Sequence, residues 1–101
     1  MATKNTNKSD NFVVLYFDTD GCTDPKIKTA PVDKETAKAK LKALWKANLA
    51  RNGYEMPTAD VDGSLYSEDA YLSANGMEAT MKPYEDATYE NKWLVVKIPT
   101  K

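Results

Sequence analysis

The chain has 101 residues, and because a domain usually contains about 100 to 150 residues, this length leaves room for one domain and excludes a two-domain enzyme. Hydrophobic residues make up 42% and charged residues 29% of the chain, which is typical of a globular protein and not of a collagenous or wholly disordered one. A formal net charge of −1 argues against a protein that holds nucleic acid or anionic lipid through bulk charge.

The first ten residues are polar and nearly free of large apolar side chains, so we predict a flexible N-terminal tail over residues 1–10 and a single domain over residues 11–101. The tail has no apolar stretch that could act as a signal peptide, and no window approaches the roughly 18 apolar residues of a membrane span. We therefore expect a cytoplasmic protein that does not bind a membrane.

A run of β-branched and aromatic residues, Phe12–Phe17, comes first and is followed by Asp18–Gly21. This pattern predicts a strand that is buried on both faces, which we expect to be the central strand, and then a turn. Residues 22–31 contain Pro25 and Pro31, which predicts a connection with one short edge segment.

A helix is predicted from Asp33, a good N-cap, to about Asn52-Gly53. Val32 and Ala37 have the spacing of a hydrophobic staple around this cap. The apolar stripe that should pack on the sheet, with Trp45 as its deepest anchor, is Ala37, Leu41, Leu44, Trp45 and Leu49. Four lysines recur along one edge of the stripe, and the back of the helix is lined by Ala39, Ala43, Ala47 and Ala50.

The second half of the chain starts with a loop over residues 54–63, which contains Pro57. Asn75-Gly76 between Ala70–Ala74 and Met77–Met81 predicts a hairpin with a two-residue turn, although the Ala and Met content also fits a helical turn. After a turn over residues 83–86, an apolar run at 93–98 predicts a strand that pairs beside the first. The expected fold is α+β: a small, three- to four-stranded, mainly antiparallel sheet with one amphipathic helix packed on one face.

Missing residue types restrict the chemistry of the protein. The chain has no His, which removes the commonest general base and metal ligand, and its single cysteine, Cys22, cannot close an intramolecular disulfide. Cys22 is expected to be a structural residue in a reducing compartment. No serine, threonine or lysine has a recognisable activating base. We therefore predict a protein that is not an enzyme and uses no metal or other cofactor.

The most suggestive local motif is Asp18-Thr19-Asp20, because two carboxylates after a strand can hold Mg²⁺ for phosphoryl chemistry. It resembles the Asp-x-Asp loop of haloacid-dehalogenase-type phosphatases and, with Tyr16, the Tyr-x-Asp-Thr-Asp motif of family B DNA polymerases. Both families need a far larger scaffold and further carboxylates, so a solvated turn is the expected structure. A magnesium-dependent phosphoesterase that uses Asp18 and Asp20 is kept as a third hypothesis.

A second acidic motif, Asp60-x-Asp62-x-Ser64, has the opening spacing of a calcium loop. Leu65 stands where such a loop needs Gly, and Tyr71 stands where it needs Glu. We therefore expect an ordinary acidic loop here.

Charge is divided unevenly along the chain. Residues 1–51 contain 10 basic and 6 acidic side chains, whereas residues 52–101 contain 4 basic and 9 acidic ones together with all six tyrosines except Tyr16. Tyrosine offers a large contact area at low entropic cost, and carboxylates orient a basic partner. The predicted protein-binding residues are Tyr66, Glu68, Asp69, Tyr71, Tyr84, Glu85, Asp86 and Tyr89.

The alternative function is a small nucleic-acid-binding protein that uses the basic side chains of the helix. These residues are Lys34, Lys38, Lys42, Lys46 and Arg51. Their spacing along one edge would allow contacts with successive phosphates.

The layout over about residues 11–99 resembles that of many short proteins from phages and bacterial mobile elements: a buried strand, one Lys/Ala-rich helix, a hairpin, and the closing strand Lys92–Ile98. Such proteins include host-takeover factors and anti-CRISPR-type inhibitors, which commonly act by stoichiometric binding. The resemblance implies an inhibitor in the host cytoplasm, but it carries over no functional residue. From the uneven charge and the tyrosines of residues 52–101, we expect this inhibitor to bind a basic, nucleic-acid-handling host protein through its acidic, tyrosine-rich half. The resemblance implies no oligomeric state.

Overall fold

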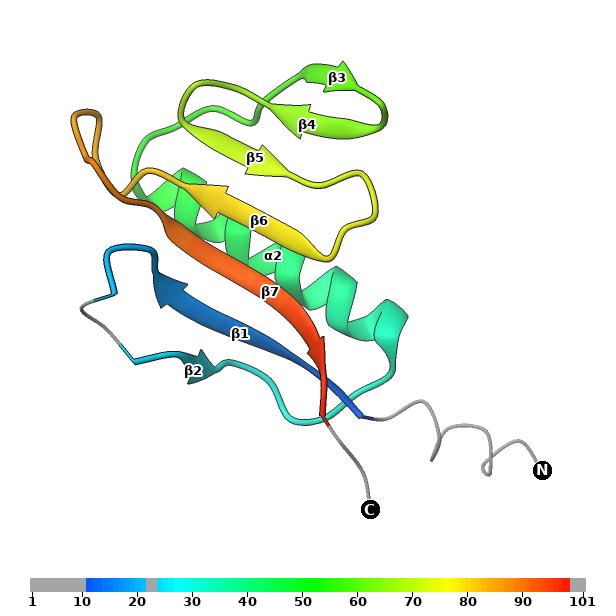
Figure 1. The fold of residues 1–101 in the computed structure, drawn as a ribbon. Helices are drawn as coiled ribbons and strands as arrows, with labels where there is room; N and C mark the ends of the chain where they lie inside the picture. Colours follow the sequence, from blue (N-terminus) through cyan, green and yellow to red (C-terminus); the bar gives the residue numbers. More distant parts are fainter. Residues whose placement is uncertain (1–10, 22–23, 99–101) are drawn as a thin grey trace.

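In a computed structural model, residues 11–21 and 24–98 form an antiparallel sheet with a helix on one of its faces (Figure 1). These are the residues that the structure describes. The predicted tail over residues 1–10 and the predicted structural residue Cys22 lie outside them.

The elements follow the chain in this order: β1 (Phe12–Asp18), β2 (Lys26–Ile27), α2 (Lys34–Arg51), β3 (Ala59–Val61), β4 (Ser64–Tyr66), β5 (Ala70–Leu72), β6 (Glu78–Met81) and β7 (Asn91–Lys97). In space, the described strands lie in the order β2-β1-β7-β6-β5-β4-β3, and each pairs antiparallel with its neighbours. The α+β class is confirmed. The prediction of three to four strands is wrong, because the described part of the chain forms a seven-stranded sheet. Several of the additional strands have only two or three residues, too few to show a periodicity.

The two apolar runs pair with each other, as predicted. Phe12 opposes Lys97 and Asp18 opposes Asn91, so β1 and β7 are in register along their whole length. Val13 and Val14, which point to opposite faces, are both buried. The prediction that β1 is the central strand is wrong, since only the two-residue β2 lies beyond it.

The helix has the predicted N-terminus. The Asp33 carboxylate accepts a hydrogen bond from the Thr36 backbone N–H at 3.1 Å, which satisfies one of the free donors of the first turn. At the other end, Asn52 caps the helix, and Gly53 has a φ of 78°, a left-handed value that suits glycine.

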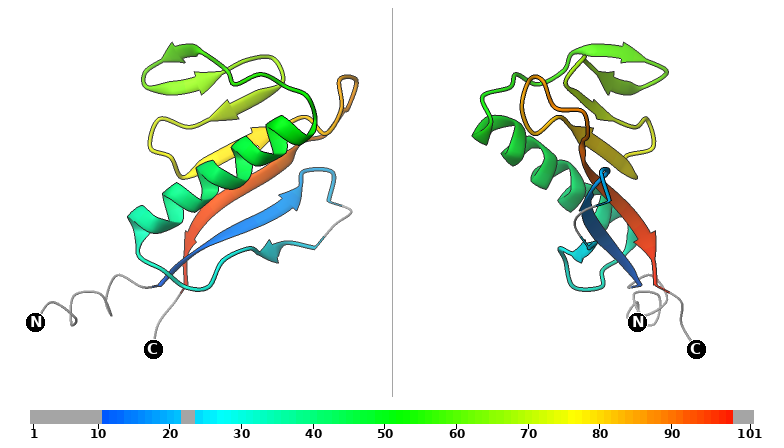
Figure 2. Two further views of the ribbon diagram at one scale, coloured as in Figure 1. Left: turned by 180° about the vertical axis from the view of Figure 1, so that it is seen from behind. Right: turned by 60° about the vertical axis from the view of Figure 1, so that its left-hand side comes forward.

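Figure 2 shows α2 lying along one face of the sheet, where it contacts β1, β6 and β7. The fully buried members of its stripe are Ala37, Leu41, Trp45 and Leu49, with Leu44 partly buried. The Trp45 indole N–H also donates to the Thr80 carbonyl of β6 at 2.9 Å. Trp45 therefore joins helix to sheet by both apolar contact and a hydrogen bond, as the predicted anchor should.

The hairpin around Asn75-Gly76 is confirmed, and the helical turn that the composition also allowed does not form. Leu72 opposes Ala79, which is the register predicted by a turn centred on these two residues. The turn itself is longer than predicted. The last ladder bond joins Ser73 N–H to the Glu78 carbonyl, and Asn75 Oδ1 instead accepts from the Met77 N–H.

A second hairpin, which was not predicted, begins in the predicted loop over residues 54–63. Asp62 and Gly63 have φ values of 59° and 85° and connect β3 to β4, with Val61 opposite Ser64. Two successive positive φ values define a type I′ turn, for which Asp-Gly is a preferred pair. The Asp-Gly pair was therefore the sequence signal for β3 and β4.

Candidate functional site

Four connections of the chain meet at one end of the sheet, on the left in Figure 1. They are the β1–β2 connection, the segment from α2 to β3, the β4–β5 turn and the β6–β7 connection. They meet because β1, β4 and β6 end there, while their antiparallel neighbours begin there.

This end of the sheet is rich in carboxylates, and we call it the acidic end. Its acidic residues are Asp18, Asp20, Asp24, Glu55, Glu68, Asp69, Glu85, Asp86 and Glu90, out of 15 in the whole sequence. Three of them come from the half of the chain that is basic on balance. The negative charge is therefore concentrated in space and not only in the second half of the sequence.

The β6–β7 connection brings four of the predicted binding residues together. The Tyr84 and Tyr89 rings meet edge to face, with centroids 6.3 Å apart and an interplanar angle of 82°. Between them, the Ala87 N–H donates to the Tyr84 carbonyl at 3.1 Å and closes a turn that holds Glu85 and Asp86 in solvent. Tyr84 is 56% exposed, so this connection offers an aromatic surface beside two carboxylates.

A hollow of about 470 Å³ lies next to this connection, between the end of α2 and the β4–β5 turn. Its lining includes Tyr54, Asp69, Tyr84 and Glu85. Partial burial raises the pKa of Tyr54, and the negative charges of Asp69 and Glu85 raise it further. Two carboxylates from different connections therefore act on the phenol of Tyr54, which is not among the predicted binding residues.

Tyr66 and Tyr71 are directly opposite each other on β4 and β5. Their neighbours Leu65 and Leu72 contribute to the core beneath α2, so the two tyrosines point to the helix-free face of the sheet. Tyr66, the last residue of β4, also lines a hollow with Tyr54 and Asp69 and so borders the acidic end. Tyr71 lies further along the sheet. The predicted set thus spans the acidic end and the adjoining sheet face.

The Asp18 carboxylate is held by neighbouring side chains. It accepts hydrogen bonds from the Tyr16 hydroxyl at 3.2 Å and from Asn91 Nδ2 at 2.8 Å. Burial, followed by the charge and hydrogen bond of Asp18, raises the pKa of Tyr16 from 10.0 to about 12. Within residues 11–21 and 24–98, no group of three or more acidic or thiol side chains could hold a metal ion.

The residues of the calcium-like motif belong to the second hairpin. Asp62 is the first residue of its tight turn and Ser64 begins β4. The prediction of an ordinary acidic loop is therefore wrong in detail, because these residues form a hairpin with a two-residue turn.

The basic residues of α2 are divided between two sides of the helix. On one side, Lys38 and Lys42 line a hollow of about 500 Å³ against β4 and β5, and Lys38 Nζ lies 3.5 Å from Glu35. On the other side, Arg51 lines a hollow with Tyr16 and Lys28, and it donates to Asn48 Oδ1 at 3.0 Å. The five residues of the nucleic-acid hypothesis therefore do not share one surface.

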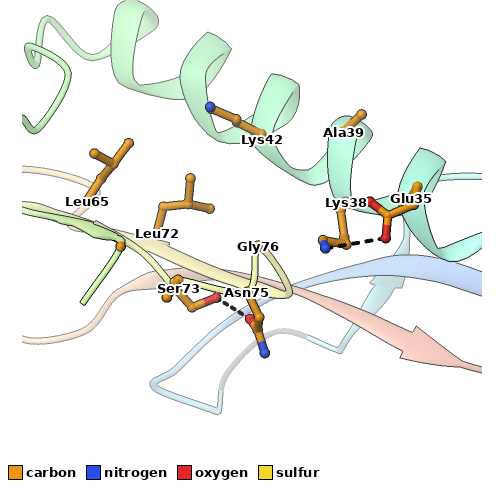
Figure 3. A pocket seen from close by; sticks show the side chains of 11 residues that line it. Glu35, Lys38, Ala39, Lys42, Leu65, Leu72, Ser73, Asn75 and Gly76 are labelled. Carbon is orange, nitrogen blue, oxygen red and sulfur yellow. Dashed lines mark hydrogen bonds and ion pairs between the residues drawn. The ribbon is translucent and has the colours of Figure 1, made fainter. Parts of the chain in front are cut away.

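Figure 3 shows the first of these hollows. Leu65 and Leu72 rise from the sheet toward α2, while the turn of the β5–β6 hairpin closes one side with Asn75 and Gly76. The Ser73 hydroxyl donates to Asn75 Oδ1 at 2.8 Å, which stabilises that turn. The lining holds an ion pair and two leucines, but no nucleophile beside a base.

Comparison with family models, curated proteins and solved structures gave no match to this chain. Within the described part of the chain, no helix combines the length and the apolar character needed to cross a membrane. The geometry of the residues is therefore the basis for the functional argument.

Proposed function

We propose that this protein is a non-enzymatic interaction module that binds a basic protein surface through the acidic end. The single observation that carries the proposal is the convergence of four acidic connections around Tyr54, Tyr84 and Tyr89. Carboxylates steer and orient a cationic partner, while exposed tyrosines contribute apolar contact area.

Inhibition is the mechanism that we propose for such a module. Lys- and Arg-rich grooves that hold nucleic acid are basic, and carboxylates at the acidic end would stand where phosphates otherwise lie. Occupying such a groove needs no catalytic group, which fits a chain of this size. We therefore propose a phage-type, stoichiometric inhibitor of a nucleic-acid-handling host protein in the host cytoplasm.

We favour this proposal over direct binding of nucleic acid. Lys38 is paired with Glu35, and Arg51 lies on the other side of α2 from Lys42. A phosphate backbone would therefore meet a divided set of cations next to an acidic end that repels it.

The proposal is tested by affinity capture from nuclease-treated lysate of the source cell. The test variant carries Glu68→Gln, Asp69→Asn, Glu85→Gln and Asp86→Asn, which remove charge at the acidic end with little change in shape. The control carries Glu35→Gln and Asp62→Asn, the same kind of change at the opposite end. Asn is well suited to the turn position of Asp62.

We expect wild type and the control to capture the same basic protein, with retention that falls as salt rises. The test variant should lose at least about tenfold of this capture, since each charged contact at an interface contributes on the order of 1 kcal/mol. Equal capture by all three proteins, or a captured partner without a basic surface, would contradict the proposal. Capture that occurs only from a parallel lysate without nuclease treatment would favour the nucleic-acid hypothesis instead.

A further inference from the structure

A hollow of about 240 Å³ lies between the second half of α2 and the β1 side of the sheet. Its lining comes from α2, from β1 and β7, and from the residue that follows β2: Leu44, Asn48, Arg51, Tyr16, Trp93 and Lys28. Tyr16 and Trp93 are opposite each other on paired strands, with their ring centroids 5.1 Å apart. A water molecule takes up about 30 Å³ of the liquid, so the hollow has room for a small polyatomic ion and several waters.

The lining of this hollow contains two cations and no carboxylate. On the helix side, Arg51 donates to Asn48 Oδ1 at 3.0 Å, and Asn48 Nδ2 donates to the Leu44 carbonyl at 2.9 Å, so the guanidinium is held in place and keeps most of its N–H donors for a ligand. On the sheet side, Lys28 Nζ lies 5.8 Å from the centroid of the Tyr16 ring. Neither cation takes part in the ion pairs of the described residues, so both positive charges are open to an anion.

The same lining contains a buried donor without an acceptor. Trp93 is 1% exposed, and its indole N–H makes no hydrogen bond to a described residue, unlike that of Trp45. The Trp93 nitrogen nevertheless reaches open space, since the side-chain polar atom that is both enclosed and unpartnered among the described residues is Asn11 Oδ1. Buried polar groups are nearly always hydrogen-bonded. An unpartnered indole donor at the wall of a hollow with two cations therefore indicates that an acceptor occupies this hollow.

We propose that this hollow binds a phosphate group, supplied either as inorganic phosphate or by a small phosphate ester. Arg51 and Lys28 match its two negative charges and donate charge-assisted hydrogen bonds to its oxygens, while Trp93 adds a neutral donor. A nucleic-acid strand fits less well, because its neighbouring phosphates would lie near Asp18 of the acidic end, which accepts a hydrogen bond from the Tyr16 hydroxyl in the lining. The site is thus one for a small anion, separate from the surface that we propose for a basic protein.

Nitrogen–proton correlation NMR of the full chain tests the proposal. The chain has two tryptophans, so its spectrum contains two indole signals, and the signal lost in Trp45→Phe identifies the other as that of Trp93. Inorganic phosphate, phenyl phosphate and acetate are each added to about 50 mM at about pH 8, where phosphate carries two charges, with sodium chloride at equal ionic strength as the reference. The test variants are Lys28→Gln and Arg51→Gln. The matched control is Lys40→Gln, which removes an exposed positive charge of α2 outside the lining.

We expect phosphate to move the Trp93 signal in a saturable way, with a dissociation constant of about 1 mM, because exposed cations hold a small anion weakly. The Trp45 signal should stay in place, since its N–H is bonded to Thr80, and it shows in the same spectra that each variant is folded.

Each test variant should weaken phosphate binding about tenfold, whereas Lys40→Gln should bind like wild type and Arg51→Lys, which keeps the charge, within about threefold of it. Acetate, with one charge, should bind at least about tenfold more weakly than phosphate. Tighter binding of phenyl phosphate than of inorganic phosphate would support an ester as the ligand, and equal binding would support the free ion. A Trp93 signal that does not move, an equal shift with sodium chloride or acetate, or test variants that bind like Lys40→Gln would overturn the proposal.

Discussion

Replacing Trp45 by Phe should measure how α2 is attached to the sheet. Trp45 is completely buried, and its indole N–H donates to the Thr80 carbonyl at 2.9 Å. Phenylalanine keeps one aromatic ring in the core. It lacks the indole N–H donor and the second of the two fused rings of tryptophan. Trp93 provides a matched control, because it is 1% exposed but makes no indole hydrogen bond to a described residue.

The expected cost follows from two contributions. Losing about 40 Å² of buried apolar surface costs about 1 kcal/mol at 25 cal/mol per Å². Losing the hydrogen bond costs about 1 kcal/mol more. Trp45→Phe should therefore lower the free energy of unfolding by about 2 kcal/mol, and Trp93→Phe by about 1 kcal/mol. For a domain of this size, 2 kcal/mol lowers Tm by about 8–16 °C.

Urea unfolding followed by far-UV circular dichroism measures both variants, because this signal does not depend on the tryptophan that is replaced. The slope of the free energy of unfolding against urea concentration should be the same in both variants as in wild type. An unchanged slope would show that the substitutions alter stability and not the surface exposed on unfolding. If Trp45→Phe is no more destabilising than Trp93→Phe, the hydrogen bond to β6 does not contribute as we argue.

Three further changes probe local features of the fold. Gly76 has a φ of 75°, and a Cβ there would lie 3.1 Å from Lys38 Cε, so Gly76→Ala should destabilise the protein by about 1 kcal/mol; an unchanged urea midpoint would contradict this. Asp33→Ala should cost about 1 kcal/mol through loss of the helix cap, whereas Asp33→Asn should unfold like wild type. The raised pKa of Tyr16 means that the folded protein keeps the phenol proton between pH 10.0 and about 12 while the unfolded chain releases it, so stability should fall as pH rises through this window. Tyr16→Phe should remove that part of the pH dependence, and an identical slope in both proteins would refute the assignment.

The helix was predictable because its signals are local. The signals are the N-cap Asp33, the apolar stripe that contains Trp45, and Gly53 after the last turn, and each acts on residues close to it in the chain. The helix in the structure begins and ends within about two residues of the predicted bounds. The Asn75-Gly76 hairpin is similar, since a turn pair sets the register of the residues on either side. In contrast, β3 and β4 have three residues each and depend on the Asp62-Gly63 turn and on pairing with β5, so no pattern of alternation reveals them.

The candidate site was only partly predictable. Tyr84, Glu85, Asp86 and Tyr89 share one connection, and their proximity follows from the sequence. Tyr54 was missed, because its relation to Asp69 and Glu85 depends on where the end of α2 meets two other connections. Tyr71 was included because it is a tyrosine, although its strand directs it onto the sheet face.

By itself, the sequence determined the α+β class, the extent of α2 and the pairing of two long apolar strands, because short-range sterics and side-chain period specify these features. The order of the strands was decided only in the tertiary structure, where β7 inserts between β1 and β6. That order brings Asp18 and Asp20, from the half that is basic on balance, to the same end as Glu85 and Asp86. The molecule thus has an acidic end although its net charge is only −1. Which charges lie close together in space depends on how the strands pair, and the order of charges along the chain does not determine it.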